Sequence, residues 1–332
     1  MQPVRWGILS TAKIGRVKVV PGMMKSPLCA VVAVASRDAA SARDMAAELG
    51  IAKAYGSYDA LLADPEVEAI YNPLPNHLHV PITLAAAAAG KHVLCEKPIA
   101  ITSGEAEQLT QAASQVLIAE AFMVRHHPQW QRARELIQSG EIGDLRSIHV
   151  DFSYFNVDPG NIRNRADIGG GGLLDIGCYA VVAGRYFFDA EPVRVVALVD
   201  RDPSFGVDRT TSALMDFVGG RQLTFVVSTQ SVPFQRVRIL GTKGRIEIEI
   251  PFNAPPDQPT RIFLDDGTLH GNRSAQAIEF PVVDQYQLQG EAFSRAVRGD
   301  TALGYGLEDA LMNMRILDSL RRSEASSGWE AV

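Results

Sequence analysis

The sequence has few cysteines: only Cys29, Cys95 and Cys178 occur among its 332 residues, and they lie far apart. An odd number at such spacing favours reduced, buried thiols over a disulfide framework or a cysteine zinc site. Long apolar runs are scarce too. Its apolar runs, such as residues 84–89, are far shorter than the about 20 residues that cross a bilayer, and residues 1–7 carry no signal-peptide pattern. We therefore expect a soluble, cytoplasmic protein with no membrane partner.

An excess of positive charge is also absent. Lysine and arginine total 32 against 38 aspartate and glutamate residues, a formal net charge of −6. Such a chain has no general attraction for nucleic acid, so nucleic acid is not an expected partner. With 46% hydrophobic and 21% charged residues the chain can bury a core. At about 150 residues per domain, its length predicts two domains.

The first third of the chain alternates apolar, β-branched runs with alanine-rich segments of helical period. The runs predict strands over residues 4–9, 30–35, 68–71, 92–95 and 116–119, and the other segments predict helices over residues 14–24, 39–49, 58–62, 81–89 and 103–113. Alternation at this spacing is typical of a parallel sheet with right-handed crossovers. We expect an α/β domain over residues 1–122, a Rossmann-type doubly wound sheet that binds a dinucleotide.

The pattern changes after residue 122. A helix over residues 129–138 precedes strand-like segments at residues 145–155, 193–200, 211–217, 222–229, 236–240, 245–250 and 260–264, and further helices are predicted at residues 173–187, 286–297 and 307–322. A hairpin turn signal lies at residues 242–244. We expect residues 123–332 to form an α+β domain with a large, mostly antiparallel open sheet. This domain would bind substrate and form a dimer through the uncovered face of its sheet.

The turn after the first predicted strand is the expected place for a pyrophosphate, but it is poor in glycine. Where the dinucleotide fingerprint has Gly-x-Gly-x-x-Gly, this chain has Ser10-Thr11-Ala12-Lys13-Ile14-Gly15. The small Ser10 and Ala12 still leave room for a phosphate at a helix N-terminus. The alternative is an ordinary strand-to-helix turn.

The end of the second predicted strand bears on which cofactor binds. Domains that bind NAD place an acidic residue there on the ribose, whereas this chain continues as Ser36-Arg37-Asp38. Arg37 suits a 2′-phosphate, so NADP is favoured over NAD. Two alternatives stay open: NAD, because Asp38 follows directly, and a solvated loop charge at Arg37.

Three segments carry the main functional signal, and together they resemble the Gfo/Idh/MocA family over essentially the whole chain. The segments are Glu96-Lys97-Pro98 after the predicted strand at residues 92–95, Pro73-Leu74-Pro75-Asn76-His77-Leu78-His79, and Gly170-Gly171-Gly172-Leu173-Leu174-Asp175-Ile176-Gly177-Cys178-Tyr179. The resemblance implies an NAD(P)-dependent oxidoreductase that acts on sugars, inositols and related diols. It also implies a dimer.

The resemblance implies roles for individual residues. Lys97 is similar to the family's catalytic lysine, and Asp175 and Tyr179 to its substrate-domain pair. Many members have histidine where Tyr179 stands; tyrosine there resembles the branch of glucose-fructose oxidoreductase, NADP-dependent xylose dehydrogenases and dimeric dihydrodiol dehydrogenase, where it is the acid/base. Residues 120–128 resemble the domain junction of that branch, and they include Arg125 as a substrate contact. The cofactor side would be lined by Pro75, Asn76, His79 and Glu96.

The residue types favour the same chemistry. Asp175 and Tyr179 are four residues apart on a predicted helix and would share one face. A nearby Lys97 cation would favour the phenolate of Tyr179, which could take the proton of a substrate hydroxyl while hydride leaves for nicotinamide. Lys97 and Asp175 would hold substrate oxygens. The structural alternatives are a surface pair of Lys97 with Glu96, a core aromatic role for Tyr179 and a helix cap at Asp175.

The glycine run at residues 169–172 predicts a close backbone approach at the substrate, because it opens the helix that bears the acid/base pair. Arg163 and Arg165, just before it, are candidate substrate contacts, and a solvated basic loop is the alternative. His77 and His79 have the spacing of two metal ligands. No further cluster of matching type accompanies them, so we predict no metal and leave a structural role open for both.

The leading hypothesis is an NADP-dependent oxidoreductase that oxidises the anomeric carbon of an aldose, or of a related cyclic polyol or diol, or catalyses the reverse reduction. A sugar–sugar oxidoreductase with tightly bound NADP is the second hypothesis. A non-catalytic dinucleotide-sensing regulator is the alternative of another class, and the presence of both Lys97 and Tyr179 argues against it. The expected partners are a small sugar or polyol and further copies of the chain, in a homodimer or a dimer of dimers formed through the C-terminal sheet.

Overall fold

The computed structural model describes residues 2–332, which form two compact units. The first comprises Met1–Met123 and Asp284–Met314, and the second comprises Val124–Val283 and Arg315–Val332. The chain leaves the first unit within a residue of the expected boundary at 122/123, but it returns for Asp284–Met314, which the sequence assigned to the second domain. The return is stabilised by helix α8 (Gln285–Val297), whose Phe293 ring packs 5.4 Å from that of Trp6.

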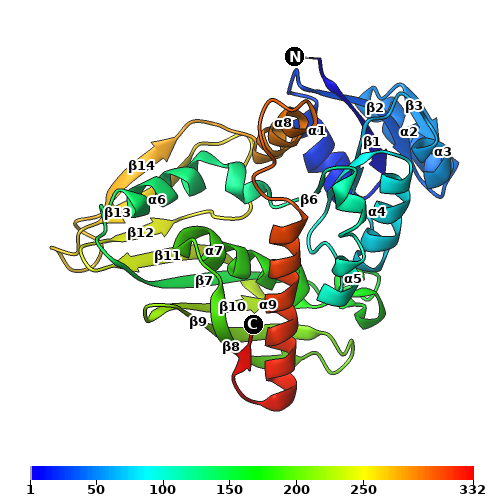
Figure 1. The fold of residues 1–332 in the computed structure, drawn as a ribbon. Helices are drawn as coiled ribbons and strands as arrows, with labels where there is room; N and C mark the ends of the chain where they lie inside the picture. The colour runs from blue at the N-terminus through cyan, green and yellow to red at the C-terminus, as the bar shows by residue number, and fades with distance from the viewer. Residues whose placement is uncertain (1) are drawn as a thin grey trace. The chain divides into compact units, whose positions relative to one another are not determined.

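The first unit contains a six-stranded sheet in the order β3-β2-β1-β4-β5-β6, with every neighbouring pair parallel. Figure 1 labels β1, β2, β3 and β6 of this sheet. The strands are β1 (Val4–Leu9), β2 (Cys29–Ala35), β3 (Lys53–Tyr55), β4 (Ala69–Asn72), β5 (His92–Cys95) and β6 (Ile118–Glu120). The helices between them are η1 (Gly15–Val19), α1 (Val20–Met23), α2 (Ala39–Leu49), α3 (Tyr58–Leu62), η2 (Asn76–Leu78), α4 (His79–Ala88), α5 (Ser103–Glu107) and η3 (Ala112–Ser114). The predicted doubly wound Rossmann sheet is confirmed.

One helix of the first unit is much shorter than predicted. The helix expected over residues 103–113 ends as α5 at Glu107, and a separate short turn, η3, follows. Only Ala106 and Leu109 are fully buried in this stretch, and most of residues 110–115 are at least partly exposed. A helix gains most of its stability from the burial of one face, so too little packing holds the second half in helical form.

The second unit contains a nine-stranded sheet in the order β14-β13-β12-β11-β7-β10-β9-β8-β15. Its strands are β7 (Leu145–Phe155), β8 (Pro192–Arg201), β9 (Asp208–Phe217), β10 (Arg221–Ser228), β11 (Gln230–Gly241), β12 (Arg245–Ile248), β13 (Thr260–Asp265), β14 (Gln276–Phe280) and β15 (Glu330–Ala331). Only the β7–β10 pair is parallel. The predicted, mostly antiparallel sheet and the β11–β12 hairpin are confirmed.

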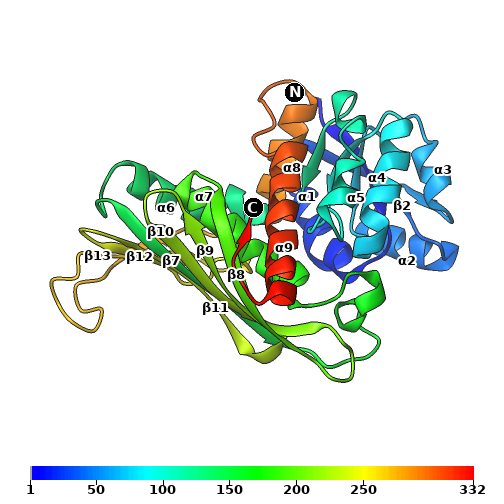
Figure 2. The same cartoon turned by 60° about the horizontal axis from the view of Figure 1, so that its bottom comes forward.

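Helices α6 (Pro128–Gln138) and α7 (Cys178–Phe188) cover one face of this sheet, as Figure 2 shows. Their core centres on Trp130, which is fully buried, stacks 4.9 Å from Phe187 and donates its indole N–H to Pro251 O at 2.8 Å. Alternate residues of the long strands point into this core, as the period of two predicts. Helix α9 (Leu307–Ser326) precedes β15, which is the last strand of the chain.

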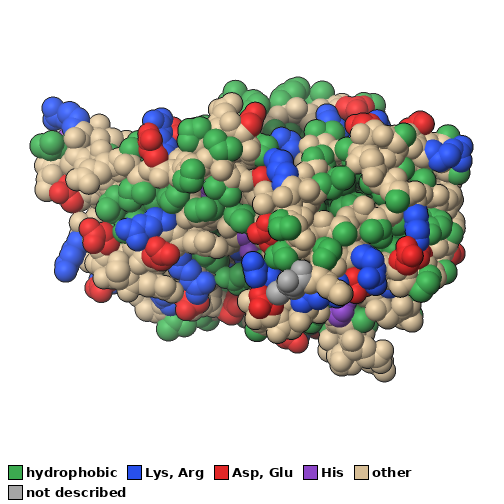
Figure 3. Space-filling view, turned by 90° about the horizontal axis from the view of Figure 1, so that it is seen from above, with side chains coloured by type: hydrophobic (Ala, Val, Ile, Leu, Met, Phe, Trp, Pro, Cys, Tyr) green, Lys and Arg blue, Asp and Glu red, His purple; other side chains and the backbone are tan. Residues whose placement is uncertain are grey.

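One helical stretch, Ala166–Phe188, is long and apolar enough to cross a membrane by length and composition alone. Most of it is buried inside the protein, which is the pattern of a core helix. It includes η7 (Leu173–Gly177) and α7, both packed on the nine-stranded sheet. On the face drawn in Figure 3, acidic and basic side chains are interspersed with apolar ones.

Candidate active site

The turn after β1 keeps the form of a phosphate-binding loop without the usual glycines. Ser10 has a φ of +76°, in the left-handed region that favours glycine. Its backbone N–H donates to Ala35 O at 2.7 Å, and its Oγ accepts the Ala12 N–H at 3.0 Å. A Cβ on Gly15 would come no closer than 3.5 Å to Tyr71, so contacts within the protein do not require glycine at this position. The other predicted loop contacts are partly or fully exposed: Thr11, Ala12, Lys13 and Ile14.

At the end of β2, the side chain of Asp38 is engaged in capping helix α2. Its carboxylate accepts the N–H groups of Ala40 at 3.0 Å and Ser41 at 3.3 Å, and the Ser41 hydroxyl at 2.6 Å. These bonds, the hydroxyl first, lower the pKa of Asp38. Ser36 is buried and its Oγ accepts the Asp38 N–H, whereas Arg37 is exposed. The carboxylate of Asp38, the acidic residue of this turn that could bind a ribose, is therefore already engaged in capping α2. The exposed side chain of Arg37 carries a positive charge.

His79 lies inside the first unit, which fits the structural role left open for it better than a place on the cofactor side. Its ring is 1% exposed and lies between two backbone carbonyls, with Nδ1 2.7 Å from Pro98 O and Nε2 2.6 Å from Leu74 O. The ring therefore ties the loop after β4 to the loop after β5. The other predicted contacts of this segment, Pro75 and Asn76, are partly exposed at the start of η2.

Burial makes His79 a source of acid sensitivity. Desolvation lowers the pKa of His79 to about 4 and outweighs the two carbonyl contacts, which raise it, whereas an unfolded chain takes up this proton near the ordinary value of 6.5. Proton uptake by His79 in the unfolded state therefore lowers the free energy of unfolding as the pH falls from 6.5 toward 4, by about 2 kcal/mol at pH 5. We expect the free energy of unfolding in urea to fall less steeply between pH 7 and pH 5 in His79→Asn than in the wild type. His77→Asn, at an exposed position two residues earlier, is the control, and equal slopes in all three proteins would refute this account.

The turn that carries Lys97 is fixed by its neighbours at the carboxyl end of β5. The Glu96 N–H donates to Asn72 O at 3.0 Å, and the Ile99 N–H donates to the buried carboxylate of Glu120 at 2.8 Å. The Lys97 side chain is partly buried. The structure thus places Lys97 where open parallel sheets bind their ligands, as predicted.

Glu96, the residue before the lysine, is anchored within the first unit. It accepts the hydroxyl of the fully buried Tyr71 at 2.6 Å. Burial and the charge of Glu96 raise the pKa of Tyr71 well above its usual value, so this hydroxyl remains a donor. Glu96 therefore helps to orient the lysine turn.

In the second unit, Asp175 lies at the centre of a polar cluster. It belongs to η7, and its Oδ2 accepts the Tyr154 hydroxyl at 2.6 Å and Arg163 Nε at 2.8 Å. The side chain of Asp175 is 12% exposed, and that of Arg163 is 41% exposed. The helix-cap alternative for Asp175 is wrong, because the carboxylate that accepts the Leu173 N–H at this helix start is that of Asp208.

The ring of Tyr179 is held by two other aromatic residues. Its centroid lies 5.8 Å from that of Phe152 and 5.3 Å from that of Phe252, and those two rings stack at 4.6 Å. The residue begins the second turn of the continuous helix formed by η7 and α7, and it is 5% exposed. Such packing fixes the direction of the hydroxyl with a rigid ring.

The glycine run serves internal packing. A Cβ on Gly170 would lie 2.6 Å from the carbonyl oxygens of both Arg163 and Arg165, and a Cβ on Gly171, where φ is +114°, would overlap the carboxylate of Asp208. The close approach that the structure shows at these glycines is therefore between parts of the chain itself. It brings Gly170 against the carbonyls of Arg163 and Arg165, and Gly171 against Asp208 at the start of β9.

The remaining arginines differ in setting. Arg125 is 4% exposed within η4 (Met123–His126). Arg165 forms an exposed ion pair with Asp167, with Nη2 and Oδ2 2.6 Å apart. The alternative of a solvated loop charge fits Arg165 better than substrate contact does.

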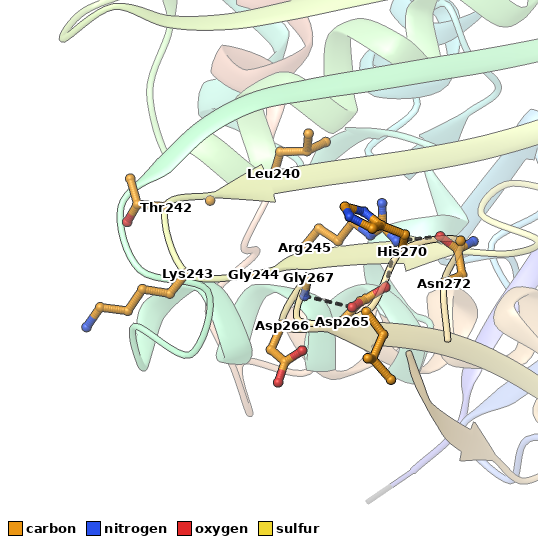
Figure 4. Close-up of a pocket in the computed structure, with 13 residues that line it drawn as sticks. Leu240, Thr242, Lys243, Gly244, Arg245, Asp265, Asp266, Gly267, His270 and Asn272 are labelled. Carbon is orange, nitrogen blue, oxygen red and sulfur yellow. Dashed lines mark hydrogen bonds and ion pairs between the residues drawn. The ribbon is translucent and has the colours of Figure 1, made fainter. Parts of the chain in front are cut away.

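A cavity of about 430 Å³ lies at the far end of the nine-stranded sheet, away from every predicted site residue (Figure 4). Its main charges are paired: Arg245 Nη2 donates to Asp265 at 2.6 Å and also contacts Asn272. We regard this cavity as a feature of the β11–β12 and β13–β14 turns. Within residues 2–332 no group of three or more histidine, cysteine or acidic side chains is placed to hold a metal ion, and the three cysteines are buried thiols that form no disulfide.

Sequence reasoning missed Tyr154, Asp208, Phe152 and Phe252. All four contact the η7–α7 helix from strands or loops that lie far away in sequence. The alternation of β7 places Phe152 and Tyr154 on one face, and this was an available signal that two aromatic residues face the same side.

The first unit thus has a Rossmann sheet with Lys97 at the end of a central strand, and the second has Asp175 and Tyr179 on one buried helix. Residues 4–118 match the model of an oxidoreductase family with an NAD-binding Rossmann fold, and residues 130–247 match the GFO/IDH/MocA C-terminal domain. The chain belongs to the GFO/IDH/MocA family, as the motifs predicted.

Three proteins that are similar to this chain differ in the activities for which they are named. A D-xylose 1-dehydrogenase (NADP(+)) of Haloferax volcanii is 38% identical, with 96% of each chain covered. A trans-1,2-dihydrobenzene-1,2-diol dehydrogenase of Mus musculus is 38% identical, with 74% of each covered. A 3-ketoreductase from Actinomadura kijaniata, solved with NADP and TDP-benzene, superimposes with a TM-score of 0.90 at 30% identity, with 97% of this chain and 98% of that chain covered.

Proposed function

We propose that the protein is an NADP-dependent oxidoreductase that transfers hydride between nicotinamide and an aldose, or a related cyclic polyol or diol. The observation that carries the proposal is the rigid placement of Lys97 at the carboxyl end of β5, on a fold whose relatives include an NADP-dependent xylose dehydrogenase. The Ser10 loop and the exposed Arg37 fit a dinucleotide with a 2′-phosphate.

The bound nicotinamide supplies the hydride acceptor in the oxidative direction. In that direction the phenolate of Tyr179 takes the proton of the substrate hydroxyl at its Oη. The ammonium group of Lys97 would donate a hydrogen bond to a substrate oxygen, and its charge would favour the phenolate form. The carboxylate of Asp175 orients a neighbouring hydroxyl of the substrate. In the reductive direction Tyr179 returns the proton.

A substrate screen tests this function. Purified protein is mixed with aldoses, inositols or trans-dihydrodiols together with NADP⁺ or NAD⁺, and reduced nicotinamide is followed by absorbance. We expect turnover with an aldose such as D-xylose, and a higher kcat/KM with NADP⁺ than with NAD⁺. If no alcohol of the screen is oxidised with either NADP⁺ or NAD⁺, the proposal is overturned.

Arg37→Ala tests the cofactor preference. We expect the Kd for NADP⁺ to rise by about ten- to a hundredfold, because a charge-assisted contact to the 2′-phosphate is lost, while the Kd for NAD⁺ changes little. Isothermal titration with each cofactor measures both. Arg43→Ala, which removes another exposed arginine on α2, is the control. Equal weakening of both cofactors by Arg37→Ala would exclude the 2′-phosphate role.

A homodimer, or a dimer of dimers, formed through the nine-stranded sheet belongs to the same proposal, as does a cytoplasmic location. The sheet face opposite α6 and α7 exposes apolar side chains, with Leu198 77% and Phe155 64% exposed. Val226 and Phe234 lie on the same face. Exposed apolar groups shared by four strands favour burial against a second copy.

A further inference from the structure

Two donors from separate segments of the second unit contact the same oxygen of Asp175. Tyr154, next to last in β7, donates its hydroxyl to Oδ2 at 2.6 Å, and Arg163 in η5 (Ile162–Asn164) donates Nε to Oδ2 at 2.8 Å. We propose that Tyr154 and Arg163 are positioning residues that set the orientation of the Asp175 carboxylate for the substrate. This inference rests on the oxidoreductase function proposed above.

Tyr154 acts in this arrangement as a permanent donor. It shares the helix-covered face of β7 with Phe152, so its hydroxyl reaches η7 from the sheet. Burial, followed by the charge of Asp175, raises the pKa of Tyr154 far above its usual value. The hydroxyl therefore keeps its proton at working pH, and Tyr154 does not compete with Tyr179 as a base.

Arg163 is held in place by the loop that carries it. Its backbone N–H donates to Asn161 Oδ1 at 3.0 Å, and its carbonyl accepts the Gly171 N–H at 2.8 Å. Gly170 packs so closely against that carbonyl that a Cβ would lie 2.6 Å from it. The glycine run thus explains why a half-exposed arginine keeps a fixed contact with Asp175.

The two donors have complementary effects on the carboxylate. Two donors on one oxygen, from different directions, fix the plane of the group more firmly than either does alone. The guanidinium also compensates the negative charge of a side chain that is only 12% exposed. Loss of either donor would weaken the constraint on the orientation of the Asp175 carboxylate, although Tyr179 and Lys97 would remain unchanged.

The test compares Tyr154→Phe and Arg163→Gln with wild type, using D-xylose and NADP⁺ as the probe. We expect kcat/KM to fall by about ten- to a hundredfold in each variant, since each loses a hydrogen bond to a charged group. The acidic limb of the kcat/KM profile should move to higher pH, because a carboxylate that loses a donor is protonated more readily. Arg165→Gln, two residues further along in an exposed ion pair, is the matched control and should stay within about twofold of wild type.

Crystal structures of both variants provide a second measurement that needs no turnover. We expect the Asp175 carboxylate to be rotated relative to wild type in each. If wild type oxidises no alcohol in the substrate screen, the proposed function fails and the crystal structures still decide the positioning role. Wild-type kcat/KM in either variant, or an unchanged Asp175 carboxylate in either structure, would overturn the inference.

Discussion

Replacing Tyr179 by phenylalanine is expected to lower kcat by about 10²- to 10⁴-fold, the usual contribution of a positioned acid/base. The substitution removes only the hydroxyl. The ring keeps its contacts with Phe152 and Phe252, so the fold and the packing of α7 should survive. Steady-state kinetics on the best substrate of the screen measure the loss, and thermal unfolding checks that the variant is folded.

Tyr186→Phe is the matched control for this substitution. Tyr186 lies on the same helix, is buried, and packs 5.4 Å from the ring of Trp130, but no role in the reaction is proposed for it. We expect its kcat to stay near that of wild type. If Tyr179→Phe retains turnover within about twofold, Tyr179 is not the acid/base and the proton must pass through another group.

The first sheet could be predicted nearly strand by strand because its information is local. Buried parallel strands such as β2 and β5 are short apolar runs, and they alternate with helices whose caps are legible in the sequence, such as Asp38 before α2 and Ser57 before α3. The strand β3 was missed because it is an edge strand of three residues, none of them buried. The edge strands β14 and β15 were missed for a similar reason.

The return of α8 to the first unit illustrates what local patterns leave out. Its amphipathic period predicts a helix but does not say which sheet the apolar face will meet. In the structure, α8 packs on residues of the first unit. Gly290 lies so close to Met23 that a Cβ on Gly290 would be 2.9 Å from the Met23 side chain, and Ser294 Oγ accepts the indole N–H of Trp6 at 3.2 Å. Such pairings across nearly 290 residues depend on shape complementarity, which no single segment encodes.

The candidate site shows the same contrast between local motifs and contacts made by distant segments. Lys97, Asp175 and Tyr179 could be selected as candidates because they stand in motifs, whereas the residues that contact them belong to other elements. Asp175 and Tyr154 are 21 residues apart and meet only when β7 packs under η7. For His79 the motif left both a cofactor-side role and a structural role open, because the motif does not show that both ring nitrogens face backbone carbonyls.

Replacing Lys97 by methionine is expected to lower kcat/KM by about 10²- to 10³-fold, comparable to the loss of one preorganised donor to a reacting oxygen. Methionine keeps the length and apolar stem of the side chain but not the charge. The backbone hydrogen bonds of Glu96 and Ile99 that fix this turn do not involve the lost group, so the fold should persist.

Lys91→Met is the control that distinguishes the specific loss of the Lys97 charge from the general effect of removing a buried lysine. Lys91 precedes the same strand and donates its ammonium to the carbonyls of Asp64 at 2.8 Å and Val67 at 2.7 Å. We expect that variant to unfold at a lower temperature with kcat near wild type, and Lys97→Met to show the reverse. Since a lysine that only paired with Glu96 at the surface would cost little when removed, near-normal kcat/KM in Lys97→Met would favour that structural role over catalysis.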